Sequence, residues 1–103
     1  MAIPANWQNP IKSPPGQLQS NLDPLQLLPS RIDLSQVRLD MQRALSDAGI
    51  ERNTPIEVTP DGVVWDGHHA VRIAAEKRSL VTVKVVNAKV NPKASSIMVL
   101  PVS

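Results

Sequence analysis

Apolar side chains recur at helical spacing within residues 31–49, which predicts the first of two main helices. Asp33 is its expected N-cap, Gln36 completes a capping-box pattern, and Gly49 is a natural C-terminal stop. One face of this helix is apolar, while charged and amide side chains occupy the opposite face. The apolar face consists of Val37, Met41, Ala44, Leu45 and Ala48.

The second half of the chain predicts three strands and the second main helix. Residues 55–59 and 80–86 alternate between apolar and polar side chains, which is typical of strands with one buried face. The β-branched and aromatic run at 63–65 predicts a short strand between them. From His68 onward the residues favour a helix. The side chains expected to face inward are Ile56, Val58, Val71, Ala74, Ala75, Val81, Val83 and Val85.

This order of elements predicts a small α/β (α+β) domain with a short mixed sheet and two main helices. The connection from 63–65 through the second helix to 80–86 is a candidate right-handed β-α-β crossover. The apolar run at 96–102 predicts a last strand, which Pro101 would restrict to the edge of the sheet.

Residues 1–30 differ from the rest of the chain, because they hold six of the ten prolines. Proline fixes φ and lacks a backbone donor, so neither a helix nor a central strand is expected here. We expect an extended arm whose first part is mobile and whose residues 22–30 pack on a domain formed by 31–103. The alternatives are a linker from a larger parent protein and an arm exchanged within an oligomer.

Two turns frame the strand at 63–65. Thr59-Pro60-Asp61-Gly62 has the residue types of a tight turn. Asp66 stands where the N-cap of the second helix is expected, and Gly67 allows a sharp turn and the close approach of a ligand. Free N–H groups and the helix dipole make such a helix start attractive to an anion.

Composition excludes several classes of protein. The chain has 103 residues, which is enough for one small domain with a single core. Cysteine is absent, so neither disulfides nor thiolate metal sites are expected. No apolar run reaches membrane-spanning length and no signal pattern opens the chain, which predicts no membrane association. The sequence leaves the oligomeric state open.

Charge is distributed unevenly along the chain. From Ala70 to the end there are six basic residues and one acid, Glu76. This third of the molecule is either a patch for phosphate or nucleic acid or a solvated basic surface. The basic residues are Arg72, Lys77, Arg78, Lys84, Lys89 and Lys93.

The short strand Ile56-Glu57-Val58, the sequence Asp66-Gly67-His68-His69 at a helix start, and the valine-rich strand that follows resemble the ParB/sulfiredoxin superfamily. The resemblance covers about residues 31–86. It implies phosphate chemistry at the helix start by a ParB-like nuclease or nucleotide hydrolase, or by a toxin domain of a larger secreted protein. His68 occupies the position of the sulfiredoxin cysteine, so cysteine redox chemistry is excluded.

The resemblance also implies roles for individual residues. The candidate catalytic residues are Asp66, His69, His68 and Glu57. The candidate phosphate-binding residues are Gly67, His68, His69, Arg72 and Arg31. The cofactor it implies is Mg²⁺ bound together with a nucleotide, with Asp66 as its protein ligand.

The chain departs from the family pattern at one position. Many relatives carry an arginine that grips phosphate where this chain has Ala70. Arg72 lies about 200° further around the helix and does not simply replace it. A non-catalytic module that binds nucleic acid or protein is therefore the alternative function.

These functions imply different partners and locations. The ligand is expected to be a nucleotide or nucleic acid, and a toxin would add an immunity-type protein. The expected location is the cytoplasm, or the cytoplasm of a target cell for a toxin domain.

Overall fold

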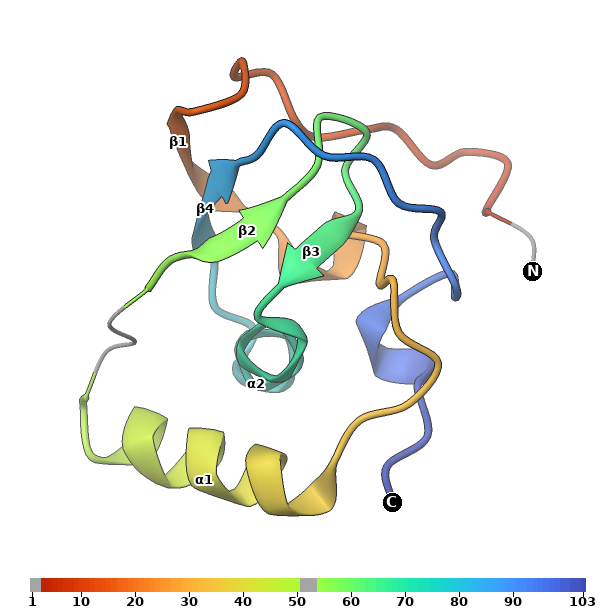
Figure 1. Ribbon diagram of the computed structural model, residues 1–103. Coiled ribbons are helices and arrows are strands. Elements are labelled where there is room, and N and C mark those ends of the chain that lie inside the picture. Colours follow the sequence, from red (N-terminus) through yellow and green to blue (C-terminus); the bar gives the residue numbers. More distant parts are fainter. Residues whose placement is uncertain (1–2, 51–53) are drawn as a thin grey trace.

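One mixed sheet of four short strands forms the upper layer of the molecule (Figure 1). The computed structural model describes residues 3–50 and 54–103. The strands lie in the order β1-β4-β2-β3. Their bounds are Leu18–Leu22 (β1), Ile56–Val58 (β2), Val64–Asp66 (β3) and Val81–Val85 (β4).

Strand register follows from the predicted alternation. β2 and β4 are parallel neighbours, with Ile56 opposite Val83 and Val58 opposite Val85. All four of these side chains are buried. The outer strands run antiparallel to their neighbours, β1 beside β4 and β3 beside β2. The predicted small α+β domain with a mixed sheet and two helices is confirmed.

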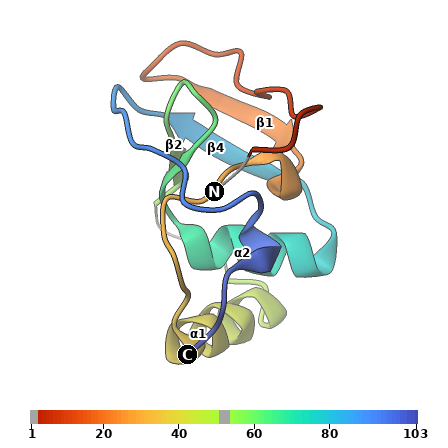
Figure 2. The ribbon, with the colours of Figure 1, turned by 90° about the vertical axis from the view of Figure 1, so that its right-hand side faces the viewer.

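Helix α2 (His68–Lys77) lies between the sheet and helix α1 (Gln36–Asp47), so the molecule has three layers (Figures 1 and 2). Because α2 is covered on two sides, four of its ten residues are buried: His68, Val71, Ile73 and Ala75. α1 is the outermost layer, and Leu39 is its one buried residue. Within the described part of the chain, no helix has the length and apolar content needed to cross a bilayer.

The predicted first helix is confirmed as α1, but its N-cap differs from the prediction. Ser35 is the N-cap, and its side chain accepts a hydrogen bond from the N–H of Arg38, whereas Asp33 lies two residues before this cap. The apolar face containing Val37 and Met41 points away from α2 and is exposed. The opposite face packs on α2, where Leu39 is buried and charged side chains of α1 have charged partners on α2.

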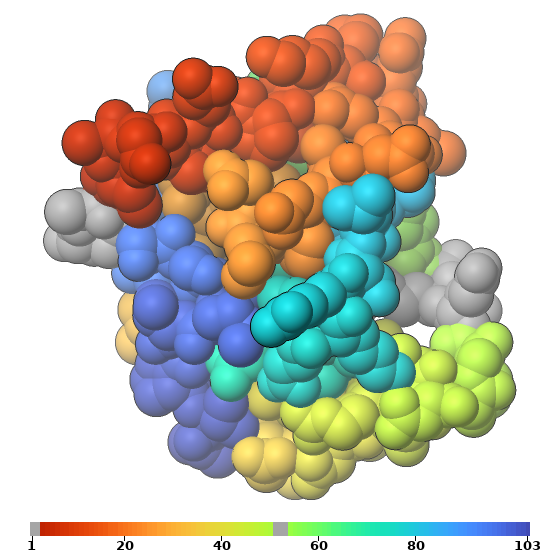
Figure 3. Space-filling view, turned by 180° about the vertical axis from the view of Figure 1, so that it is seen from behind, coloured from red at the N-terminus to blue at the C-terminus, as the bar shows by residue number. Residues whose placement is uncertain are grey.

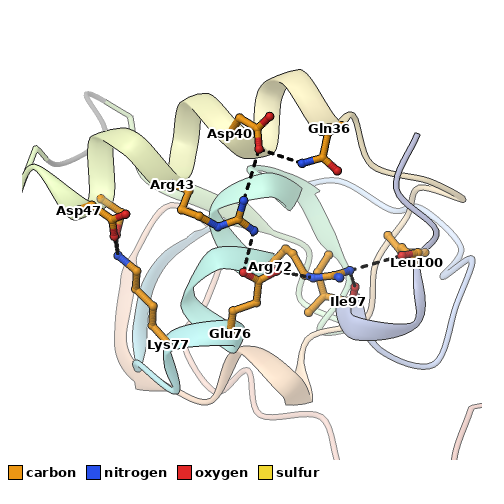
Figure 4. A network of polar contacts seen from close by, with 10 residues as sticks. Gln36, Asp40, Arg43, Asp47, Arg72, Glu76, Lys77, Ile97 and Leu100 are labelled. Carbon is orange, nitrogen blue, oxygen red and sulfur yellow. Dashed lines mark hydrogen bonds and ion pairs between the residues drawn. The ribbon is translucent and has the colours of Figure 1, made fainter.

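Those partners form a network of ion pairs between the two helices (Figure 4). Arg43 of α1 lies 2.8 Å from Glu76 of α2, and Lys77 lies 2.7 Å from Asp47. Glu76 also pairs with Arg72 at 3.0 Å. The hydrogen bond from Arg43, followed by that from Arg72, lowers the pKa of the Glu76 carboxyl.

The predicted β-α-β crossover is wrong. β3 is antiparallel to β2, and β2 is parallel to β4, so β3 and β4 run in opposite directions with β2 between them. The tight turn after β2 causes this arrangement, because it folds β3 directly back onto β2. The parallel connection is instead the one from β2 to β4, with β3 and α2 both inside it.

The predicted strand at 96–102 is also wrong. Ile97–Val99 is a 3₁₀ helix, η2, and the hydroxyl of Ser96 accepts a hydrogen bond from the N–H of Met98. Pro101 lacks a backbone donor, and only Val102 makes an isolated bridge, to Leu34. A local cap and a proline therefore prevent continuous pairing in this segment.

The proline-rich segment runs across one end of the molecule (Figure 3, red to orange). β1 lies within it and pairs with β4 at the edge of the sheet. A second 3₁₀ helix, η1 (Pro24–Gln26), follows, and Leu22, Leu27 and Leu28 are buried in the core. The segment before β1 is held by the Gln19 side chain, which accepts from the N–H groups of Lys12 and Ser13.

The turn between β2 and β3 has a tight contact that predicts unequal effects of two glycine substitutions. Gly62 and Gly16 both have positive φ, 84° and 92°. A Cβ at Gly62 would lie 2.6 Å from Oδ1 of Asn9, whereas nothing lies within 4 Å of one at Gly16. Asn9 donates to the Pro60 carbonyl and accepts from Ile11 N–H.

We expect Gly16→Ala to lower the free energy of unfolding by about 1–2 kcal/mol through backbone strain alone. Gly62→Ala should cost roughly 1–3 kcal/mol more, because Asn9 must move and lose its hydrogen bonds. Urea unfolding of both variants measures the difference. Equal losses in the two variants would show that the contact with Asn9 has no energetic importance.

Candidate functional site

The second helix begins directly after an abrupt turn at the end of β3. Gly67 is the N-cap of α2, with φ at 101°, and no side-chain hydrogen bond from the described residues caps this start. The predicted N-cap, Asp66, is therefore wrong, because Asp66 is still the last residue of β3 and the helix starts after one further residue. Glycine has no side chain, so the cap residue itself offers no acceptor to the N–H groups of the first turn.

An open cleft of about 270 Å³ lies beside this helix start. Its walls come from the loop before α1, from one side of α1, and from the turn between β3 and α2. The lining residues are Arg31, Arg38, Met41, Gln42, Leu45, Asp66, Gly67, His68 and His69.

Positive charge predominates in the cleft. Arg31 donates to the Asp33 carbonyl and lies 3.7 Å from its carboxylate. Arg38 makes no ion pair within residues 3–50 and 54–103, and the dipole of α2 places further partial positive charge at the same place. Asp66 is the only carboxylate among the described residues that line the cleft.

His68 is a buried, neutral hydrogen-bond acceptor. Its Nε2 accepts from the backbone N–H of Ser30 at 3.0 Å, and the Ser30 hydroxyl donates to the Val64 carbonyl at 2.6 Å. A ring nitrogen that accepts carries no proton, so the proton of His68 is on Nδ1. Burial lowers the pKa of His68 to about 4, and the nearby charge of Arg31 acts in the same direction.

His69 has a matching arrangement one residue later. Its Nε2 accepts from the backbone N–H of Ser35 at 3.0 Å, and Ser35 is the N-cap of α1. Partial burial lowers the pKa of His69, and the charges of Arg31 and Arg38 add to this effect. The two histidines thus hold the segment 30–35 against the start of α2.

This use of Nε2 restricts what the histidines can do chemically. Neither ring can take a proton at Nε2 without losing its hydrogen bond to the backbone, and Nδ1 can only donate. In this geometry the imidazoles can donate to an anion but are poor general bases. Asp66 is the group in the cleft that can accept a proton.

The structure brings most of the sequence-predicted site residues together. Arg31, Asp66, Gly67, His68 and His69 all line the cleft. Glu57 does not; it lies in β2, opposite Asp66 of β3 on one side and Lys84 of β4 on the other.

Arg72 is also outside the cleft. Its guanidinium bonds to Glu76 at 3.0 Å and to the carbonyls of Ile97 and Leu100 at 3.3 Å (Figure 4). Arg72 therefore fastens the C-terminal segment to α2, and phosphate binding is not supported by its position.

Two cleft residues, Arg38 and Gln42, are absent from the sequence-based prediction. They are four residues apart and lie on the polar side of α1. Their spacing shows that they share a side of the helix, but only the packing of α1 on α2 shows that this side borders the helix start.

Comparison of the chain with protein-family models, with curated proteins and with solved structures gave no match.

The depressed pKa of His68 predicts a loss of stability in mild acid. The unfolded chain takes up a proton on this residue near pH 6.5, whereas the folded chain does so only near pH 4. The free energy of unfolding should therefore be level above about pH 7 and fall as the pH drops from about 6.5 to 4. Urea unfolding at intervals between pH 7.5 and 5 measures this slope.

His68→Asn removes the titrating group, so its slope over the same range should be smaller than that of the parent. His69→Asn is the matched control, because His69 is less buried. A parent curve that is flat between pH 7 and 5 would contradict the neutral, buried His68.

Proposed function

We propose that the cleft binds a phosphate group of a nucleotide or nucleic acid, and that the chain is a ParB-like nuclease or nucleotide hydrolase. The observation that supports this is the convergence of Arg31, Arg38 and the uncapped N-terminus of α2 on one cleft. Arginine and free helix N–H groups are the usual partners of phosphate in proteins.

The position of the D-G-H-H sequence supports the ParB/sulfiredoxin-like assignment. Asp66-Gly67-His68-His69 connects a short strand to a helix, as the resemblance implies, and the valine-rich β4 follows. The arginine that relatives carry after the motif is missing, and Ala70 stands in its place. Arg38 of α1 reaches the same cleft from another element, which restores a positive charge there.

In the proposed hydrolysis Asp66 is the general base. It takes a proton from the attacking water, the new phosphorus–oxygen bond forms, and the bond to the leaving oxygen breaks. Arg31 and Arg38 offset the negative charge on the phosphoryl oxygens. The histidines act as hydrogen-bond donors through Nδ1.

Holding the implied Mg²⁺ is the alternative role of Asp66, because a carboxylate that coordinates the ion does not also act as the general base. Within the described residues no three histidine or carboxylate groups gather around one point. Mg²⁺ commonly takes one or two protein carboxylates together with substrate phosphates and water, so a single aspartate is compatible with it. When bound, Mg²⁺ would neutralise phosphate charge.

A non-catalytic phosphate-binding module is the second candidate. It is favoured by the hydrogen bonds that use Nε2 of both histidines, since these make the imidazoles structural. A toxin domain with an immunity-type partner remains part of the first proposal, because nuclease activity is the property such a domain would need.

Removal of Arg38 tests phosphate binding. We expect Arg38→Ala to weaken binding of ATP or a short single-stranded DNA about 10–100-fold, the usual loss for one charge-assisted hydrogen bond. Calorimetric titration at fixed salt measures the affinity. Lys89→Ala removes the same charge from an exposed loop outside the cleft and should change the affinity much less. Equal losses would point to nonspecific attraction.

Substitution of Asp66 tests catalysis. Asp66→Asn should slow hydrolysis of nucleotide or DNA by about 10²–10⁴-fold, because the amide cannot accept the proton. Binding of the same ligand should change only a few-fold. The assay is run with and without Mg²⁺. A parent chain that binds without cleaving is the non-catalytic module, and one that does neither refutes the phosphate proposal.

A further inference from the structure

Helix α1 exposes an apolar stripe to solvent. The side chains of Val37, Met41 and Leu45 are 69 %, 63 % and 42 % exposed, and the two alanines on the same face are also exposed. Isolated apolar side chains on a surface are ordinary, but a continuous row along one helix marks an interaction site. We call this row the α1 stripe; it comprises Val37, Met41, Ala44, Leu45 and Ala48.

Within residues 3–50 and 54–103, no other element covers this stripe. α1 is the outer layer of the molecule (Figures 1 and 2), and its ion pairs with α2 come from the opposite face (Figure 4). That face is fixed by the buried Leu39, by the pair of Arg43 with Glu76, and by the bonds of Lys77 to Ser46 and Asp47. Turning the stripe inward would break all of these contacts.

The stripe continues at its C-terminal end. The N–H of Ile50 donates to the Leu45 carbonyl at 2.9 Å, which places Ile50 beside the last turn, and Ile50 is 56 % exposed. From Val37 to Ala48 the stripe extends along about 16 Å of helix, at 1.5 Å per residue. This length matches a partner helix of about three turns.

Charge differs between the two edges of the stripe. On one edge lie Arg38 and the cleft, and Met41 and Leu45 belong to both the stripe and the cleft wall. On the other edge lie Asp40 and Asp47, whose charges are paired with Arg43 and Lys77.

Arg31 adds to the positive charge on the cleft side. It also lines the cleft, where Asp66 is the carboxylate that opposes the two arginines. Unpaired positive charge therefore borders the stripe on the cleft side, at Arg38, which makes no ion pair within the described part of the chain.

We propose that the α1 stripe and the adjoining cleft dock an acidic amphipathic helix of a partner protein. Apolar residues of that helix cover Val37, Met41 and Leu45, and a carboxylate on its flank meets Arg38 and Arg31. Docking of an apolar helix face with anchors at i, i+4 and i+7 is a common mode of recognition. This inference does not depend on phosphate chemistry, although phosphate in the cleft would compete with the carboxylate.

A second copy of this chain fits the surface less well. The acidic side chains along the stripe, Asp40 and Asp47, are already paired within the molecule. A second α1 would therefore cover the apolar residues without offering a free carboxylate to Arg38. An acidic helix of another protein can both cover the apolar residues of the stripe and offer a free carboxylate to Arg38.

Two synthetic peptides test the proposal on the full chain. Both are three-turn helices with leucine at i, i+4, i+7 and i+11; one carries glutamate on both flanks and the other carries lysine. NMR titration of the ¹⁵N-labelled chain reports where and how tightly each binds. We expect the glutamate peptide to shift the amides of the stripe and of Arg38, and to bind at least about tenfold more tightly than the lysine peptide.

Charge reversal provides the matched variants. Arg38→Glu should invert the preference between the peptides, whereas Lys89→Glu should leave it unchanged. Met41→Asp should abolish binding of the glutamate peptide; Met41 is 63 % exposed, so the fold should tolerate the change. Equal binding of both peptides, binding of neither, or shifts confined to another surface would overturn the proposal.

Analytical ultracentrifugation of the chain alone tests whether a second copy of the chain binds the α1 stripe. A concentration-dependent dimer that Met41→Asp abolishes would assign the stripe to a second copy and overturn the acidic partner. Inorganic phosphate titrated into the same sample separates the two proposals. Phosphate binding without peptide binding refutes the docking surface alone, and the reverse result refutes the phosphate site alone.

Discussion

Two backbone N–H groups, those of Ser30 and Ser35, are satisfied by the imidazoles at the start of α2, and much of the structure depends on these two bonds. They hold both ends of the segment 30–35, which leads into α1. The second bond joins the N-cap of α1 directly to the first turn of α2.

This arrangement connects the fold to the candidate site. Arg31 lies inside the held segment, and Arg38 lies in the first turn of the helix that follows. The histidines thereby fix the arginines beside an uncapped helix start, and together they form the cleft. The same bonds occupy the lone pairs that a histidine base would need, which is why the proposed function gives anion binding to the arginines and proton transfer to Asp66.

The packing of α1 shows that an apolar face does not by itself decide how a helix is oriented. A helix with an apolar face usually turns that face inward, because burial removes apolar area from water. Here Glu76 of α2 pairs with Arg43 of α1, and Lys77 of α2 pairs with Asp47 of α1. Leu39 completes this contact as the buried apolar residue. The apolar residues opposite are left at the surface, where another protein can cover them.

The sequence alone determined those features that depend on neighbouring residues. The alternation of Val81, Val83 and Val85 predicted a half-buried strand, and the turn at 59–62 predicted the reversal between β2 and β3. The two helices were predicted for the same reason, since helical periodicity is a property of a short stretch of chain.

Only the tertiary structure decided which helix face is buried, which residues cap the helices, and which strands are neighbours. Periodicity shows that Val37 and Met41 share a side of α1, but it does not show what lies opposite that side. The contacts between α1 and α2 as a whole decide this, and the residues of α2 that make them lie about 30 positions further along the chain. Likewise, Asp66 qualifies as a cap by residue type, but pairing with β2 keeps it in β3 and transfers the cap to Gly67. Contacts between distant segments therefore assembled the cleft from residues whose local patterns could not place them together.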